Sequence, residues 1–232
     1  MFHNLDIELN GGVTALLGPN GSGKTTLLRT LATVQPPRGG RLLIEGQEVR
    51  SESIARALRR RISYLPQRFG FEPGMRVRDF VRYGAWLRDL PPGDWADATA
   101  AALQHVGLTD ESGVRMGRLS GGMRQRAAIA WAIVGRPGLV LLDEPTVGLD
   151  TQQRLRFRDT VANMPASTVL LSTHLIDDVD AICERVVVMH TGGIRFTGTT
   201  DELRALDDAS MPGHTPLERA YMSLLPVQER RR

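Results

Sequence analysis

The sequence predicts an α/β fold in which a mostly parallel β-sheet carries helices on its faces. Short apolar runs of strand length alternate with helix-like stretches along most of the 232 residues. A glycine-rich loop over residues 18–26 follows one such run and opens a helix. Alternation of strands with crossover helices favours a parallel sheet.

The first half of the chain contains four predicted strands. Leu5, Ile7 and Leu9 alternate with acids, which indicates a half-buried strand. Residues 13–17 are apolar except for Thr14, as in a central strand that is covered on both faces. A helix is predicted over 25–34, a strand over 41–45, and a short strand over 62–65 that runs into Gln67.

In the middle of the chain the apolar residues have helical spacing. Helical spacing predicts helices between residues 77 and 106, interrupted at Pro91, with Asp94 as the N-cap of the second and Gly107 as its stop. A third helix follows Ser120 and runs to Val134.

The second half returns to strands, predicted over 139–142, 168–171 and 185–189. Gly192 and Gly193 predict a hairpin turn before a last strand over 194–197. Two short helices, over 202–206 and 216–225, are predicted in the tail.

Composition is typical of a soluble globular protein, with 41% hydrophobic and 24% charged residues, and the length suits one large domain or two small lobes. A net charge of +3 does not by itself indicate nucleic-acid binding. Cys183 is the only cysteine, so we expect a reducing compartment and a buried thiol. No apolar run is long enough to span a bilayer and no signal-peptide pattern is present. We therefore expect a cytoplasmic chain that meets a membrane only through a partner.

The glycine-rich loop fits the P-loop pattern, in which backbone N–H groups and a lysine surround phosphates. Lys24 is the only lysine, whereas the other 28 of the 29 basic residues are arginine. A compact ammonium suits a tight phosphate loop better than a planar guanidinium. The loop reads, in order, Gly18, Pro19, Asn20, Gly21, Ser22, Gly23, Lys24, Thr25 and Thr26.

Asp143 and Glu144 end the strand predicted over 139–142. An acid at the carboxyl end of a strand beside a P-loop can hold Mg²⁺, together with the hydroxyl of Thr25. The second acid can polarise a water molecule for attack on a phosphate. Alone, such a pair of acids could equally cap the following turn.

The order of the motifs resembles the nucleotide-binding subunit of ATP-binding cassette (ABC) transporters over nearly the whole chain. The loop at 18–26 is followed by Gln67, by Leu-Ser-Gly-Gly-Met at 119–123, by Asp143-Glu144-Pro145, by Gly148-Leu149-Asp150 and by His174. The Leu-Ser-Gly-Gly element distinguishes this family from other P-loop NTPases, including kinases and GTPases. On its own, a Ser-Gly-Gly turn could be a simple helix cap.

The resemblance implies a RecA-like core over about 1–67 and 137–200, an inserted helical subdomain over about 68–136, a small antiparallel β portion and a helical tail over about 201–232. It implies a single ABC ATPase domain that dimerises head to tail around two ATP molecules. A separately encoded integral-membrane permease would complete the transporter, and the chain would be peripheral on the inner face of the cell membrane.

The resemblance also implies residue roles. Lys24 and the loop would hold the β- and γ-phosphates, while Thr25, Gln67 and Asp143 would serve Mg²⁺. Gln67 would also contact the attacking water and respond to the membrane partner. Glu144 would be the general base and His174 would hold the γ-phosphate. The remaining residues would complete the site of the other copy or link the two sites: Ser120, Gly121, Gly122 and Asp150.

Two departures from the family pattern are present. Met123 stands where the family usually has glutamine, and we expect a modest loss of activity. The aromatic residue that stacks on adenine in the family would lie upstream of this chain's first residue, with Phe2 the nearest stand-in. We hypothesise that the chain discriminates ATP poorly from GTP.

Residues 64–71 and 215–221 look like the exporter branch that moves drugs, antibiotics or polysaccharides. Residues 68–90 would dock the permease, with Phe69, Phe71, Tyr83 and Trp86 lining a groove or forming core. Arginines 76, 78, 82 and 88 could face anionic lipid or form a solvated helix face. The alternative function is a non-transport ABC ATPase that acts on ribosomes or DNA, although the chain lacks the long coiled-coil insertion or second cassette usual there.

Overall fold

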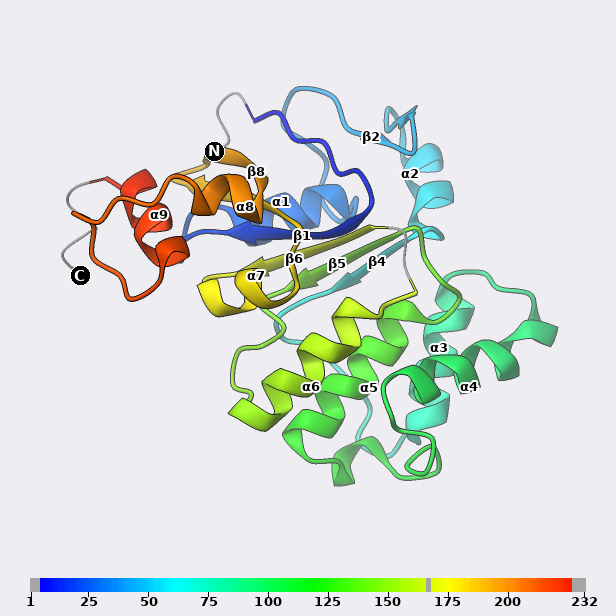
Figure 1. Cartoon of the computed structure of the whole chain (residues 1–232). Coiled ribbons are helices and arrows are strands. Elements are labelled where there is room, and N and C mark those ends of the chain that lie inside the picture. Colours follow the sequence, from blue (N-terminus) through cyan, green and yellow to red (C-terminus); the bar gives the residue numbers. More distant parts are fainter. Residues whose placement is uncertain (1–4, 166–167, 227–232) are drawn as a thin grey trace.

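The computed structural model describes residues 5–165 and 168–226 (Figure 1). One six-stranded sheet has the order β4, β5, β6, β1, β7, β8, and only the β7–β8 pair is antiparallel. The predicted α/β class with a mostly parallel sheet is confirmed. The strands are β1 Gly12–Leu17, β2 Leu43–Ile44, β3 Gln47–Glu48, β4 Ile62–Leu65, β5 Leu139–Asp143, β6 Thr168–Thr173, β7 Arg185–His190 and β8 Gly193–Thr199.

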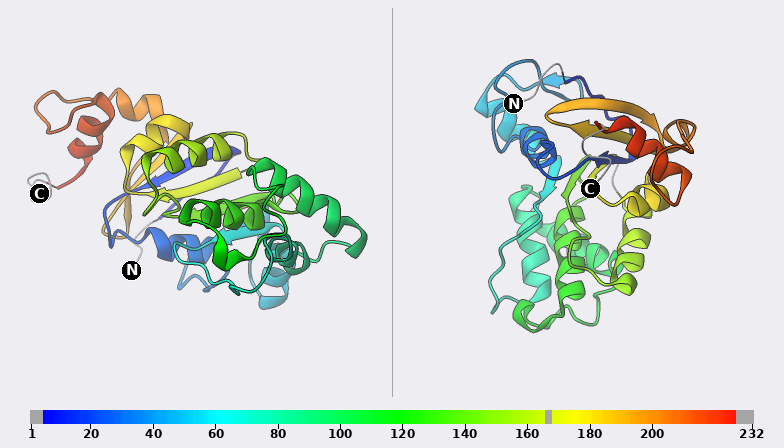
Figure 2. Two further views of the ribbon diagram at one scale, coloured as in Figure 1. Left: turned by 90° about the horizontal axis from the view of Figure 1, so that it is seen from below. Right: turned by 90° about the vertical axis from the view of Figure 1, so that its left-hand side faces the viewer.

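Helices cover both faces of the sheet. Views from three directions agree that α3, α4 and α5 lie side by side on the opposite side of the sheet from α1 (Figures 1 and 2). The short strands β2 and β3 form a separate antiparallel pair. The helices are α1 Lys24–Leu31, α2 Glu52–Arg59, α3 Val77–Leu87, α4 Trp95–His105, α5 Gly121–Ile133, α6 Thr151–Ala162, α7 Ile176–Ile182, α8 Thr200–Arg204 and α9 Pro216–Leu224, with 3-10 turns at Pro92–Asp94 and Met116–Arg118.

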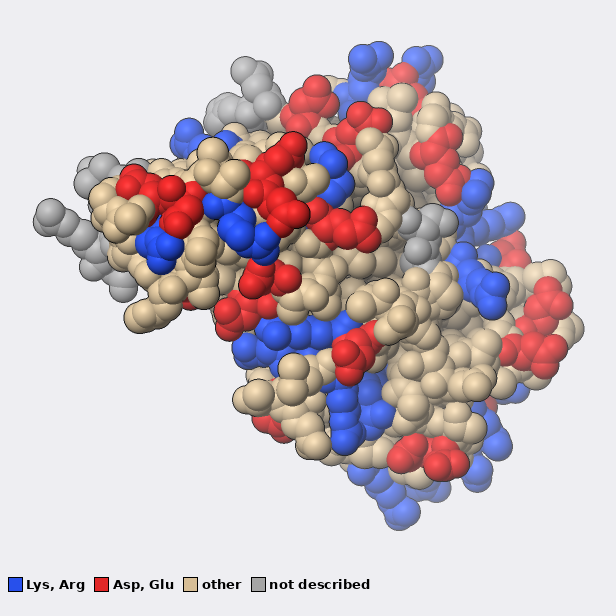
Figure 3. All heavy atoms as spheres, in the orientation of Figure 1, with Lys and Arg blue, Asp and Glu red and all other residues tan. Residues whose placement is uncertain are grey.

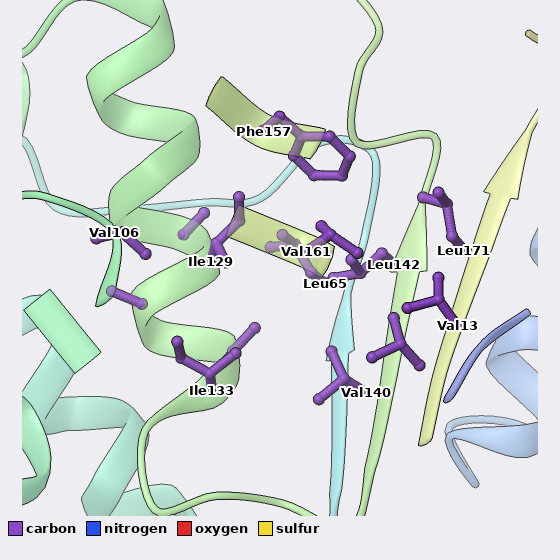
Figure 4. Packing of buried hydrophobic residues seen from close by; sticks show 14 of the residues in the cluster. Val13, Leu65, Val106, Ile129, Ile133, Val140, Leu142, Phe157, Val161 and Leu171 are labelled. Carbon is purple, nitrogen blue, oxygen red and sulfur yellow. The ribbon is translucent and has the colours of Figure 1, made fainter. Parts of the chain in front are cut away.

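The sheet divides the buried apolar side chains into two cores. Alternate residues of a strand point to opposite faces, so Ala15 and Leu17 enter one core while Leu16 enters the other. The larger core lies against α3 to α6, where Phe157 and Val161 of α6 pack toward the strands (Figure 4). This packing fixes α6 against the sheet. No helix in the described ranges is long and apolar enough to cross a membrane.

The predicted strand over residues 5–9 is wrong, although its burial pattern is right. Leu5, Ile7 and Leu9 are half-buried against the smaller core, while Asp6 and Glu8 are exposed. The segment joins no sheet, because alternation requires only an extended chain lying on a core, whereas a strand also needs a hydrogen-bonded neighbour. The predicted strand over 41–45 is reduced to the two residues of β2 for the same reason.

Of the four arginines predicted to face lipid or solvent, Arg76, Arg78 and Arg82 are exposed, but the prediction is wrong for Arg88. The Arg88 side chain is buried between α3, α5 and β4, and only 6% of its surface is exposed. It donates to the carbonyls of Gly84, Trp131 and Ala132 and to the Ser63 hydroxyl, and its guanidinium lies over the Trp131 ring. Burial lowers the pKa of Arg88 to about 10, which still leaves it charged at neutral pH.

Asp94 directly precedes α4, as predicted, but its side chain makes no capping hydrogen bond. Its backbone is already helical because a 3-10 turn runs into α4, so the carboxylate is not presented to the first free N–H groups. Gly107 ends that helix with φ of 64°, as a C-terminal glycine does.

Candidate functional site

The glycine-rich loop connects β1 to α1 in a conformation that few other residues could adopt. Gly21 and Gly23 have φ of 83° and 106°. A Cβ on Gly18 would lie 2.3 Å from the carbonyl oxygen of Met189, so the loop is held close to β7. The Ser22 hydroxyl is buried and has no hydrogen-bond partner among the described residues. A compact loop with a buried donor and glycine-exposed backbone fits a phosphate group.

Lys24 lies inside this loop rather than in solvent. Its Nζ donates to the carbonyl oxygens of Gly18 at 2.7 Å and Pro19 at 3.3 Å. It also lies 3.1 Å from Oε1 of Glu144. The ammonium is thus held at the mouth of the loop by two carbonyl dipoles and one carboxylate.

Glu144 connects Lys24 to His174. Its Oε2 lies 2.8 Å from Nδ1 of His174, and its backbone N–H donates to the Ser172 hydroxyl at 2.9 Å. The Glu144 backbone has φ of 47°, in the left-handed region that a side chain other than glycine seldom adopts. Backbone strain of this kind persists only where the surroundings hold it, and it gathers at functional sites.

Asp143 is buried, and both of its carboxylate oxygens accept hydrogen bonds from hydroxyls. Oδ1 accepts from Thr25 at 3.1 Å and from Ser172 at 2.8 Å, and Oδ2 accepts from Tyr64 at 3.2 Å. Burial and the nearby Asp143 carboxylate raise the pKa of Tyr64, although its hydrogen bond with Arg29 opposes this, so the phenol stays protonated and able to donate. Mg²⁺ in nucleotide sites uses one or two carboxylates, waters and substrate phosphates. Thr25 and Asp143 therefore fit that ion.

Gln67 is brought to the same edge of the sheet by strand register. Leu65 of β4 pairs with Leu142 of β5, and Asp143 pairs with Ser172 of β6. Gln67 lies two residues after Leu65, Glu144 lies two residues after Leu142, and His174 lies two residues after Ser172. The Gln67 side chain is exposed. The carboxyl ends of β1, β4, β5 and β6 thus gather most of the predicted residues, as expected for ligand sites in open parallel sheets.

Ser120 and Gly122 lie elsewhere. They begin α5 and line a cavity of about 240 Å³ whose other walls come mainly from α5 and α6. Loop residues Pro19 to Ser22 instead line a second cavity, of about 370 Å³, with His190, Thr191 and Leu225. Within one chain, the structure therefore does not join the Ser-Gly-Gly turn to the phosphate loop.

The side chains of Ser120 and Asp150 cap the N-termini of α5 and α6, the helices that they precede. The Ser120 hydroxyl accepts from the backbone N–H of Met123 at 3.2 Å, and the Asp150 carboxylate accepts from that of Gln153 at 2.8 Å. Gly121 is exposed. A Cβ on Gly122 would lie 2.7 Å from the Gln153 side chain, so this glycine allows the two helix starts to approach closely.

Of the four aromatic residues predicted to line a groove or form core, two are core residues and two are exposed. Phe69 and Phe71 are partly buried against the larger core, and Phe69 packs on Phe80. Tyr83 and Trp86 stack on each other on α3 with 46% and 55% of their surfaces exposed. Phe2, the suggested partner of adenine, lies outside the described residues.

Sequence reasoning missed two neighbours of the predicted acids, Tyr64 and Ser172. Both lie in strands whose apolar pattern signalled only burial. A polar side chain inside a buried parallel strand, near its carboxyl end, is a signal that could have found them.

The chain is similar in sequence to known proteins. A family model described as "ABC transporter" matches residues 2–147. YxlF of Bacillus subtilis, described as an uncharacterized ABC transporter ATP-binding protein, is 35% identical over 191 residues, which make up 82% of this chain and 62% of YxlF. The methionine import ATP-binding protein MetN of Caulobacter vibrioides is 33% identical over 198 residues, or 83% of this chain and 60% of MetN. The chain therefore spans about three fifths of these two relatives.

Among solved structures, CbiO1 from Clostridium perfringens has a similar fold. Its TM-score is 0.78, with 29% identity, covering 88% of this chain and 84% of that one. CbiO1 is described as part of the ABC transporter complex cbiONQ.

Proposed function

The chain belongs to the ABC transporter family, and we propose that it is the subunit that binds and hydrolyses ATP to drive transport through a separate membrane permease. The observation that carries this is the contact chain from Lys24 through Glu144 to His174, beside the bonded pair of Thr25 and Asp143. These groups are the ones that phosphoryl transfer to water requires: a cation for the phosphates, a base, and oxygen ligands for a metal ion.

The Lys24–Glu144 ion pair supports an order of events when ATP binds. Both side chains are at most 9% exposed, so separating them without a substitute partner would be costly. A nucleotide phosphate is such a partner for the ammonium. When Lys24 turns to the phosphate, Glu144 loses its cation and becomes free to act as a base.

Glu144 then accepts a proton from a water molecule whose oxygen attacks the γ-phosphorus. The bond between this phosphorus and the bridging oxygen breaks, and ADP and inorganic phosphate are the products. His174, which already contacts Glu144, orients the carboxylate and the γ-phosphate. Thr25 and Asp143, with Gln67 at the same edge of the sheet, would hold Mg²⁺, which would supply positive charge to stabilise the transferred phosphoryl group.

Each site is completed by a second copy of the chain. The support is the separation of the Ser120–Gly122 turn from the phosphate loop, which line different cavities. Ser120, Gly121 and Gly122 of one copy would meet the γ-phosphate held by the other, since a helix N-terminus attracts anions. Asp150, exposed at the start of α6, would lie between the two sites.

The Glu144→Gln protein tests this function. We expect its ATP hydrolysis to fall by a factor of about 10² or more while Mg-ATP still binds, because only the proton acceptor is lost. Light scattering with saturating Mg-ATP should show a dimer. The control is Glu45→Gln, which alters a surface acid paired with Arg61. A Glu144→Gln protein that stays monomeric with Mg-ATP and its permease would refute the shared site.

The permease would contact the helical subdomain proposed at about 68–136, between core segments at about 1–67 and 137–200 and a tail at about 201–232. Exposed Tyr83 and Trp86 support a docking surface on α3 for an apolar helix. Membrane contact would occur through this partner on the inner face of the membrane. Positive and negative side chains are intermixed on the face shown in Figure 3, so this face does not offer one continuous basic surface to a nucleic acid.

Export is our proposed direction, from the likeness of residues 64–71 and 215–221 to drug, antibiotic or polysaccharide exporters. Import is the second candidate, because MetN is an import protein and matches almost as closely as YxlF. Inside-out vesicles containing both subunits discriminate the two. ATP-driven accumulation of labelled drugs in them supports export, whereas accumulation only in right-side-out vesicles supports import. A non-transport role would be indicated if the chain copurified with ribosomes or DNA instead of a permease.

A further inference from the structure

Asp178 is a fully buried carboxylate that the proposed reaction does not use. It lies in α7, and 0% of its surface is exposed. Its Oδ2 accepts a hydrogen bond from the Thr146 hydroxyl at 2.8 Å. Its Oδ1 accepts two from the guanidinium of Arg158, at 2.9 Å from Nε and 2.8 Å from Nη2. A buried charge is stable only with such partners.

The three bonded residues come from three segments, and each segment carries a predicted site residue. Thr146 lies two residues after Glu144, in the turn that leaves β5. Asp178 lies four residues after His174. Arg158 lies on α6, whose first turn is capped by Asp150.

The residues around this junction are buried and hydrogen-bonded. Phe157, next to Arg158, is buried in the larger core and packs toward the sheet (Figure 4). The Thr146 backbone carbonyl accepts from the N–H of Leu149, so the turn between Glu144 and Asp150 is closed on itself. Through the Thr146 hydroxyl, Asp178 ties this turn to α7 and α6.

Glu144 depends on that turn for its conformation. Its φ of 47° is unfavourable for a residue with a side chain, and the N–H of Val147 donates back to its carbonyl at 3.3 Å. Loss of the Thr146 bond would let the turn relax and would change the contact between Glu144 and His174, which is 2.8 Å long.

Building on the ATPase function proposed above, we propose that Asp178 is a positioning residue, which through Thr146 and Arg158 holds the Glu144 turn in register with His174. Asp178 does not touch the substrate. It sets the distance between the base and the histidine, while the glycine-rich backbone of the phosphate loop is held by its own contacts with β7.

The Thr146→Val protein is the first test, because it removes one hydroxyl and keeps the shape of the side chain. We expect kcat to fall by about tenfold or more, since small displacements of catalytic groups have large effects on rate. KM for ATP should change by less than about twofold, because phosphate binding is unaltered. Asp178→Asn should behave likewise and Arg158→Lys more mildly.

Thr160→Val is the matched control. Thr160 is also a buried threonine, 8% exposed, but its hydroxyl donates within its own helix to the Arg156 carbonyl. The Thr160→Val protein should lose stability, but it should not show the fall in kcat at nearly constant KM that is expected of Thr146→Val. If Asp178→Asn does not fold, Thr146→Val and Thr160→Val still decide the question.

A readout independent of hydrolysis separates this proposal from the proposed function. The ring nitrogen signals of His174 in a ¹⁵N-histidine NMR spectrum report its contact with Glu144. They should shift in Thr146→Val and stay fixed in Thr160→Val. A wild-type protein without ATPase activity would refute the function and leave this measurement valid. Unchanged His174 signals in a folded Thr146→Val protein, or equal kcat losses in both threonine variants, would overturn the role of Asp178.

Discussion

The contribution of the Tyr64 hydroxyl to the site can be measured by a substitution that removes one oxygen atom. It donates to Asp143 at 3.2 Å, while Thr25 and Ser172 donate to the other oxygen of the same carboxylate. Removing a hydrogen bond that orients a metal ligand usually weakens metal binding by 10- to 100-fold. The oxygen of Tyr64 is therefore expected to matter for Mg²⁺ and not for the nucleotide itself.

We predict that Tyr64→Phe raises the Mg²⁺ concentration needed for half-maximal nucleotide binding by about tenfold. A titration of fluorescent ATP binding with Mg²⁺ measures this, and binding in EDTA should be unchanged. Tyr83→Phe, which alters an exposed ring on α3, is the control. Equal Mg²⁺ requirements for the wild type and Tyr64→Phe would contradict the prediction.

Met123 contributes its backbone rather than its side chain to the start of α5. Its N–H donates to the Ser120 hydroxyl, and its side chain packs partly buried against the larger core. We therefore predict that Met123→Gln raises kcat by less than about tenfold, equivalent to about 1.4 kcal/mol in the barrier. Steady-state ATPase assays check this, and a larger gain would show that a glutamine amide is needed here.

Cys183 is predicted to be unreactive in the folded protein. Burial, with Asp178 and Glu184 as smaller causes, raises the pKa of its thiol to about 12, so the reactive thiolate is scarce at pH 8. A thiol reagent should label it far more slowly in native than in urea-unfolded protein. Since the folded pKa lies above the unfolded one, this group's stabilisation is present below pH 9 and is lost as the pH rises toward 12. Rapid native labelling at pH 8 would be inconsistent with this burial.

At the scale of elements, α3 packs closely against α5 at Gly84, which has no side chain. A Cβ on Gly84 would lie 2.8 Å from the Trp131 ring and 2.9 Å from the Trp131 carbonyl oxygen. The carbonyl is backbone, so the helices themselves would have to move apart. Arg88, one turn later, bonds to that same carbonyl and to Ser63 in β4.

We predict that Gly84→Ala destabilises the protein by about 1–3 kcal/mol, the usual cost of overpacking, despite alanine's better helix propensity. Urea unfolding measures the difference. Gly93→Ala is the control, because no atom lies within 4 Å of a Cβ placed there. A Gly84→Ala protein as stable as the wild type would mean that α3 is not held so tightly against α5.

At the scale of the whole molecule, the proposed dimer needs a surface around the exposed start of α6. Val147 lies between Glu144 and Asp150 and is 47% exposed. A single exposed apolar side chain is ordinary on a protein surface, and it is the position of Val147 between Glu144 and Asp150 that places it at the proposed interface. A charged side chain at this position should leave the monomer folded but should weaken the dimer.

We predict that Val147→Asp, added to Glu144→Gln, weakens the dimer formed with Mg-ATP by at least about tenfold, or about 1.4 kcal/mol. Analytical ultracentrifugation gives the dissociation constants. Val34→Asp, at a position 63% exposed just after α1, serves as the control. Equal weakening by both changes would point to charge repulsion in general rather than to an interface at Val147.

Local patterns in the sequence were enough to predict the P-loop from Gly18 to Thr26, the acids at the end of β5, and most strands and helices, because periodicity and motif spacing are written into neighbouring residues. The wrong strand at 5–9 shows the limit: alternation reveals burial, but only the fold decides whether a strand finds a neighbour. Tertiary structure alone decided that Arg88 is buried, that Glu144 bridges Lys24 and His174, and that Tyr64 and Asp178 are hydrogen-bonded to Asp143 and Thr146, respectively. The contacts of Glu144 and Tyr64 join residues 30 to 120 positions apart, and they exist because parallel strands in a set register bring their carboxyl ends to one edge of the sheet.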